Sequence, residues 1–165
     1  MRKWTLGLIA GLMPLLAAAA EPVLFIDNML RLDDVIVIEG ESTRFYQQVQ
    51  LEPSKDGNFK VVGGLEKSLA TITETSVNVL QTTPVQVQLE VSGYMDTPCV
   101  QLETAVTRRG DVFYVVFAQT PLQTLVACAQ VIEPFERVVA LDVSDLGLGD
   151  YTVQVNNQSI AFRLE

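Results

Sequence analysis

The sequence contains no histidine, and this absence excludes several classes of active site. A Ser-His-Asp triad, a Cys-His pair and a histidine-ligated metal centre all require an imidazole. Only two cysteines are present, Cys99 and Cys128. They do not form a Cys-x-x-Cys redox motif, and a zinc site would need two further ligands. The sequence therefore predicts a protein that is not an enzyme and that carries no metal or other cofactor.

Basic residues are also scarce. Lys and Arg together number 11 against 20 Asp and Glu, which gives a formal net charge of −9. A surface of this sign repels nucleic acid and anionic lipid, so we expect neither as a partner. The acidic balance is instead typical of a chain that stays in solution outside the cytoplasm.

Residues 1–20 have the pattern of an export signal. Arg2 and Lys3 precede an apolar segment at residues 6–16, and the alanines at 17–20 offer small-residue cleavage sites. The apolar segment is shorter than the roughly 20 residues of a membrane span, and no stop-transfer charges follow it. We therefore predict cleavage near residue 20, no membrane insertion of the mature chain, and a periplasmic or secreted location. Cleavage would remove two positive charges and take the formal charge from −9 to −11.

The two cysteines are predicted to form a disulfide, because an exported chain folds in an oxidising compartment. Closing a loop of about 30 residues would stabilise the fold by roughly 3–4 kcal/mol.

Between Cys99 and Cys128 lies the most apolar run of the mature chain, Val112–Ala118. A continuous apolar run is typical of a strand buried on both faces. This region is therefore expected to contain the central strand of a sheet.

Residues 21–75 are predicted to form a small N-terminal β-meander and a connector. β-branched and aromatic runs indicate strands at 35–38, 45–51 and 59–62. Asp56-Gly57 lies between the last two runs and is a hairpin signal. Gly63-Gly64 is expected to end the third strand. Residues 63–75 are then expected to be a connector, in which the spacing of Leu65, Leu69 and Ile72 permits a short helical turn.

Residues 76–165 are predicted to form an immunoglobulin-like β-sandwich, so the fold class is all-β. About seven short strands with turn signals at regular spacing are typical of this architecture. Two segments are expected to be irregular: a loop at Ser92–Pro98, and a crossover at Thr120–Pro134. Tyr151 begins a late strand, and its hydroxyl is expected to bond back to the preceding turn as in a tyrosine corner.

Short motifs are spread over this second region: Pro84-Val85-Gln86-Val87, Ser92-Gly93-Tyr94-Met95-Asp96, Cys128-Ala129-Gln130, Pro134-Phe135-Glu136, Asp142–Leu146 and Gly149–Asn156. With the spacing of the two cysteines, they resemble a group of uncharacterised exported bacterial proteins. The resemblance covers residues 76–165. It implies a β-sandwich with one disulfide and an extracytoplasmic location, and it implies no catalytic residue.

Tyr94, Met95 and Asp96 are the candidate binding loop. Aromatic and Met side chains on a loop can anchor a partner. The competing interpretation is that this loop covers the end of the sandwich beside the disulfide. The predicted disulfide would hold the loop near the Thr120–Pro134 crossover, so these two segments are the first place to look for a binding surface.

Asp142, Asp145 and Asp150 surround one turn and are the candidate carboxylate cluster. Paired carboxylates can serve acid–base chemistry, and oxygen-rich loops can bind Ca²⁺. The spacing does not follow the Asp-x-Asp-x-Asp-Gly pattern, so a solvated turn is favoured and the calcium interpretation stays open as the weaker one.

Arg109-Gly110-Asp111 matches the tripeptide that integrins recognise, but a hairpin also needs Gly with a polar neighbour at this position. We favour the turn.

These observations favour a non-enzymatic binding or interaction module of the cell envelope, whose partner is an unknown protein or envelope component. Loops at one end of the sandwich or an exposed strand edge would make the contact. The alternative function is a protein inhibitor of secreted proteases, since some immunoglobulin-like domains block papain-type enzymes with three loops. The Asn-Pro-Thr-Thr-Gly and Gly-rich loop motifs that such inhibitors share are absent here.

Overall fold

A computed structural model describes residues 25–40, 42–122 and 127–165, and these residues form an all-β protein. The predicted export signal at residues 1–20 lies outside the described residues. Within the described ranges, no helix is long and apolar enough to span a membrane.

Eleven strands follow one another along the described chain. They are β1 (Phe25–Ile26), β2 (Met29–Glu39), β3 (Ser42–Pro53), β4 (Phe59–Leu69), β5 (Thr71–Leu80), β6 (Gln86–Met95), β7 (Val100–Arg109), β8 (Val112–Pro121), β9 (Glu133–Leu141), β10 (Gly149–Val155) and β11 (Gln158–Leu164).

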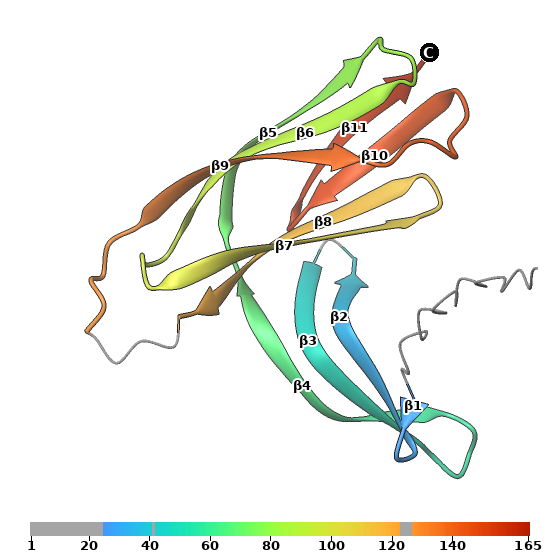
Figure 1. Ribbon diagram of the computed structural model, residues 1–165, viewed down its shortest axis with the longest axis vertical. Helices are drawn as coiled ribbons and strands as arrows, with labels where there is room; N and C mark the ends of the chain where they lie inside the picture. The colour runs from blue at the N-terminus through green and yellow to red at the C-terminus, as the bar shows by residue number, and fades with distance from the viewer. Residues whose placement is uncertain (1–24, 41, 123–126) are drawn as a thin grey trace, which may run out of the picture.

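The strands form two sheets, which Figure 1 shows together with their connections. The larger sheet has the order β1-β2-β3-β4-β8-β10-β11, with β7 paired to the other edge of β8, and the smaller sheet has the order β5-β6-β9. Strands β7, β8, β10 and β11 pack against the smaller sheet and form the predicted β-sandwich. The remaining strands, β1 to β4, project from the sandwich, and we call them the arm (Figure 1).

The arm is a continuation of the larger sheet. Only the last two residues of β4 reach the sandwich, where Ser68 pairs with Gln119 and Leu69 pairs with Ala118 of β8. The chain then crosses at Ala70 into β5 of the smaller sheet. One nearly continuous run of extended chain therefore belongs to both sheets and joins the arm to the sandwich.

Strand β8 is buried on both faces, as its continuous apolar sequence predicts. Phe113, Val115 and Phe117 point into the core between the two sheets. Val116 and Ala118 point the opposite way and pack with Phe45 of the arm in a second, smaller cluster. The second face of β8 is thus covered by the base of the arm.

The predicted connector at residues 63–75 is wrong. Strand β4 continues through Gly63-Gly64 to Leu69, and β5 begins at Thr71, so this segment is almost entirely extended. The register of β3 against β4 shifts between Gln47 and Gln50, and again next to Gln50. With these irregularities in the ladder, β4 continues through the glycine pair. The sequence alone had indicated that the pair ends the strand.

The predicted loop at Ser92–Pro98 is also largely wrong. Residues 92–95 belong to β6 and pair along their length with β9. Gly93 is needed here because the chains approach closely: a Cβ at this position would lie 2.2 Å from the carbonyl oxygen of Thr71. A glycine required by close packing was therefore mistaken for a glycine in a loop.

Candidate functional site

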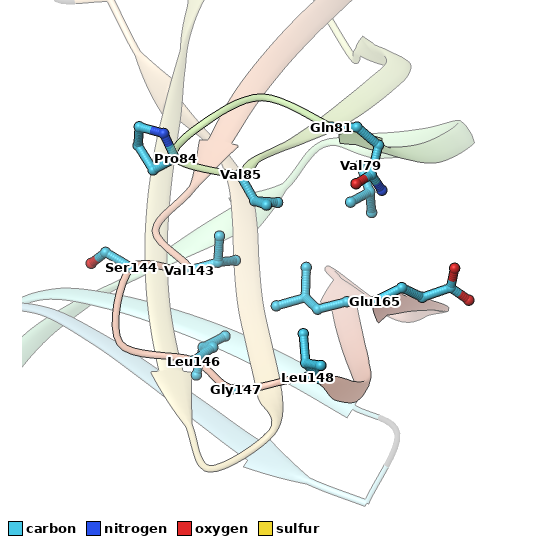
Figure 2. Close-up of a pocket in the computed structure, with 11 residues that line it drawn as sticks. Val79, Gln81, Pro84, Val85, Val143, Ser144, Leu146, Gly147, Leu148 and Glu165 are labelled. Carbon is cyan, nitrogen blue, oxygen red and sulfur yellow. The ribbon is translucent and has the colours of Figure 1, made fainter.

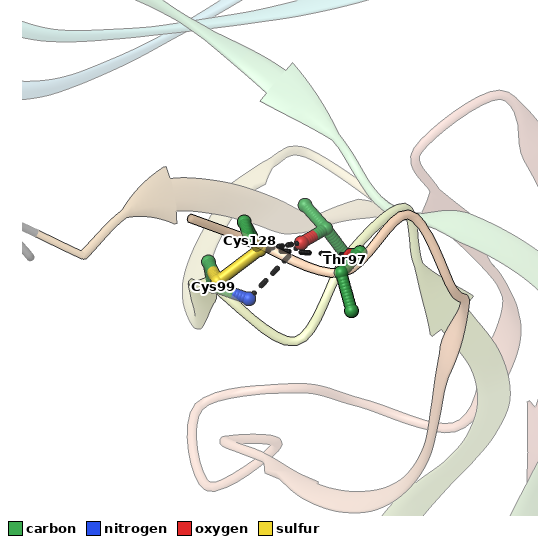
Figure 3. The surroundings of a disulfide bond; sticks show 4 residues. Thr97, Cys99 and Cys128 are labelled. Carbon is green, nitrogen blue, oxygen red and sulfur yellow. Dashed lines mark hydrogen bonds between the residues drawn. A yellow bond between two sulfur atoms is a disulfide. The ribbon is translucent and has the colours of Figure 1, made fainter. Parts of the chain in front are cut away.

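The disulfide predicted from the sequence is present. The sulfur atoms of Cys99 and Cys128 lie 2.03 Å apart, with their Cα atoms 5.9 Å apart. The hydroxyl of Thr97 accepts a hydrogen bond from the Cys99 N–H at 3.1 Å and contacts the Cys128 sulfur at 2.6 Å (Figure 3). The bond therefore fixes the short turn after β6 against the segment that precedes β9.

The three residues of the candidate binding loop do not lie together on a loop. Tyr94 and Met95 are in β6, and the side chain of Met95 is part of the main core. Asp96 follows the strand and exchanges hydrogen bonds with the buried Gln119: its N–H donates to Oε1 at 2.9 Å, and Nε2 donates to its carboxylate at 3.2 Å. This end of the sandwich is thus held by internal contacts. Partner binding by Tyr94 or Asp96 stays a prediction.

The three candidate aspartates each have a different partner. Asp142 accepts hydrogen bonds from the hydroxyl and the N–H of Ser144, and these bonds lower the pKa of its carboxyl below the ordinary value. Asp145 pairs with Arg108, and Asp150 pairs with Arg163 at 3.3 Å. Among the described residues, no group of three or more acidic, Cys or His side chains is placed to hold a metal ion.

Two smaller predictions about turns are confirmed. Gly110 forms the turn between β7 and β8 with a positive φ of 60°, and the guanidinium of Arg108 donates to its carbonyl oxygen at 3.1 Å. The Tyr151 hydroxyl donates to the carbonyl oxygen of Gly147 at 2.8 Å, which is the predicted tyrosine corner. Both features stabilise the ends of the sandwich.

A small hollow of about 220 Å³ opens at the end of the sandwich near Glu165 (Figure 2). Val85 on one side and Leu146 and Leu148 on the other face it from the connections before β6 and β10. Its volume is below the range of about 300–1,000 Å³ that is usual for small-molecule sites. We therefore interpret this hollow as the incompletely closed end of the core.

A larger apolar groove of about 510 Å³ lies on the arm. Val35 and Val37 of β2 line it together with Tyr46 of β3, because Val35 is paired directly with Tyr46 and cross-strand partners share one face. An ion pair between Arg44 and Glu39, at 3.4 Å, lies at its polar margin. The volume is within the range of ligand-binding sites, and the walls are largely apolar.

Strand β4 forms the other wall of this groove and exposes several large apolar side chains. Val61 and Val62 line the groove and are 64% and 43% exposed, while Phe59 and Leu65 on the same strand are 54% and 53% exposed. Exposed large apolar side chains beside an apolar groove are a feature of interaction sites. Sequence reasoning missed it, although the adjacent valines without polar alternation were a visible signal.

The arm is fastened to the sandwich at its base by a polar cluster. The Thr43 hydroxyl donates to the carbonyl oxygen of Asn156 at 2.6 Å and accepts from the amide of Gln154 at 3.0 Å. The Thr43 N–H donates to the side chain of Asn157 at 3.0 Å. Phe45, which is 1% exposed, packs beside this cluster against β8. These contacts give the groove a fixed position relative to the sandwich.

Comparison with known proteins supports the sandwich but not the arm. Residues 89–164 match the family model of the ORF11 beta-sandwich domain. The matched residues extend from the middle of β6 to the end of β11, so the groove lies outside them. No curated protein and no solved structure matches the chain.

Proposed function

We propose that this protein is a non-enzymatic binding module of an extracytoplasmic compartment, periplasmic or secreted. Its partner is an apolar segment of another protein or of an envelope component, which binds in the groove of the arm. The observation that carries the proposal is the groove itself, because its walls are apolar, open to solvent and placed on a projecting element. The disulfide and the export-signal pattern support the compartment.

The energetics of the arm also support a partner. A small sheet needs a hydrophobic face or packing against another element to be stable, and most side chains of β2 and β4 are exposed or only half-buried. Burying a side chain such as Phe or Val contributes about 1.5–3 kcal/mol relative to leaving it exposed. Covering the half-exposed residues of β4 would therefore yield binding free energy and would stabilise the arm at the same time.

The experiment that tests this proposal compares two valine substitutions. Val37→Asp places a charge in the groove, whereas Val138→Asp places a charge at a 62% exposed position on β9, outside the arm. The oxidised mature chain and both variants are immobilised and incubated with envelope extract. We expect the wild type and Val138→Asp to retain the same partner, and Val37→Asp to lose it.

Far-UV circular dichroism and thermal unfolding of each variant serve as the control that the chain remains folded. If Val37→Asp is folded and still retains the partner, the groove is not the binding site. If no variant differs from a blank matrix, the binding function itself is contradicted.

A further inference from the structure

Within the part of the chain that the structure describes, strand β4 has one unpaired edge along most of its length. Its inner edge pairs with β3 from Phe59 to Lys67. On the other edge, among the described residues, ladder pairing begins only at Ser68, where β8 joins. The stretch from Phe59 to Lys67 thus presents a row of backbone N–H and C=O groups without a strand partner, and such a row is a template for pairing with another chain.

The middle of this edge lacks the charged and proline residues that the β9 edge carries. Proteins usually protect exposed edges with charges or proline, and β9 follows that rule with Glu133, Pro134 and Arg137. The middle of β4, from Val61 to Leu65, has no charged residue and no proline. A neutral apolar edge of this kind favours strand addition.

We propose that two copies of this chain associate through antiparallel pairing of their β4 edges, with Gly63 of each copy at the two-fold axis. Gly63 is the midpoint of the unpaired stretch from Phe59 to Lys67, so this register uses the whole free edge. A two-fold arrangement makes the interface self-complementary and leaves no further edge of β4 open for continued growth.

The charges on β4 match this register. With Gly63 opposite itself, Lys60 of one copy lies directly opposite Glu66 of the other, and the pair occurs twice. Both side chains are exposed, and neither takes part in an ion pair within the described residues. Opposite charges in direct cross-strand positions stabilise pairing, whereas like charges destabilise it. The two ion pairs would flank a neutral centre formed by Val61, Val62 and Leu65.

Self-association would also extend the groove. Val62, Gly63 and Gly64 line the groove and lie at the centre of the paired stretch. The two grooves would then meet at the two-fold axis. The pairing and the proposed binding function can be tested separately. Val37, the residue substituted in the binding test, lines the groove from β2 and lies outside the β4 edge.

The test exchanges the charges of Lys60 and Glu66 and measures the dimer dissociation constant by sedimentation equilibrium. The oxidised mature chain is used at protein concentrations up to about 0.2 mM, so that weak dimers are detected. Lys60→Glu and Glu66→Lys each place like charges opposite one another, and we expect each to raise the dimer dissociation constant at least about tenfold. The double variant Lys60→Glu/Glu66→Lys restores opposite charges, and we expect it to dimerise as the wild type does. Lys55→Glu, in the hairpin turn before β4, is the matched control and leaves the constant unchanged.

Two results overturn the proposal. One is a wild-type chain that remains monomeric over the whole concentration range. The other is a dimer whose dissociation constant is the same in the single variants, or is not restored in the double variant. Since Val37→Asp should leave dimerisation intact while removing partner capture, failure of this proposal and failure of the binding function are distinguishable.

Discussion

Asn156 forms hydrogen bonds with both backbone groups of Phe117. The Phe117 N–H donates to Asn156 Oδ1 at 2.9 Å, and Asn156 Nδ2 donates to the Phe117 carbonyl oxygen at 3.1 Å. The same Nδ2 donates to the carbonyl oxygen of Ala70 at 2.8 Å. One buried side chain therefore accepts from the Phe117 N–H and shares the Phe117 carbonyl oxygen with the Ala70 N–H, which donates to it at 2.9 Å.

The position of this contact explains its importance. The edge of β8 pairs with β10 in parallel as far as Val115, and with β4 in antiparallel fashion from Ala118. Phe117 lies in the gap between the two partners, where its backbone groups would otherwise be buried without full pairing. Asn156 fills this gap, and its backbone adopts a positive φ of 49° that asparagine tolerates better than most residues.

Asn156→Ala should lower the free energy of unfolding by about 3 kcal/mol, because it leaves the Phe117 N–H without its partner and removes two donated bonds. The measurement is urea denaturation of the mature chain. Asn157→Ala is the matched control: this neighbour is exposed and contributes one bond, to the Thr43 N–H, so we expect a loss of about 1 kcal/mol. Equal effects of the two substitutions would contradict the role assigned to Asn156.

Gly93→Ala should destabilise the sandwich by about 3 kcal/mol or more. The added Cβ would lie 2.2 Å from the Thr71 carbonyl oxygen and 2.9 Å from the ring of Phe135, so the strands of the smaller sheet would have to move apart. Gly147→Ala is the control, because no atom lies within 4 Å of a Cβ at that position. Thermal unfolding of the two variants measures the difference, and a tolerated Gly93→Ala would show that the strands do not approach so closely.

Tyr151→Phe should lower the free energy of unfolding by about 1 kcal/mol, the usual contribution of one hydrogen bond. The substitution removes only the hydroxyl that donates to Gly147 and keeps the ring, which stacks on Phe162 with centroids 5.5 Å apart. Chemical denaturation detects this change. A stability equal to that of the wild type would mean that water replaces the lost bond without cost.

Removal of the disulfide by Cys99→Ser with Cys128→Ser should lower the free energy of unfolding by roughly 3–4 kcal/mol. The bond closes a loop with a sequence separation of 29 and restricts the unfolded chain more than the folded one. Denaturation of the double variant should agree with that of the reduced wild type, and both should be less stable than the oxidised wild type. A loss below about 1 kcal/mol would contradict this account.

The centre of the fold was predictable from local sequence because its signals are local. The apolar run of β8, the Asp56-Gly57 hairpin and the tyrosine corner each depend on a few adjacent residues. The disulfide was predictable from the number of cysteines and the export-signal pattern of the sequence. For the strand and the two turns, the chemistry of one short segment restricts its structure to one solution.

The contacts that place the arm were not predictable in this way, because they join residues far apart in the chain. The bonds of Asn156 to Ala70 and Phe117 depend on segments 86 and 39 residues away. Gly93 and Gly63-Gly64 were interpreted as breaks in structure, since a sequence does not show which backbone approaches a glycine. The groove was missed although its three strands were predicted, because the sequence does not show which of their side chains share one face.

The central claim is that the groove of the arm contacts a partner, and site-specific photo-crosslinking tests it most directly. A photoreactive benzoylphenylalanine replaces Tyr46 inside the groove or, as the control, Val138 on β9. Each chain is irradiated with envelope extract, and its adducts are identified by mass spectrometry. We predict one discrete adduct with a foreign polypeptide or envelope component from position 46, and none from position 138. No adduct at position 46, or the same adducts at both positions, would contradict the claim.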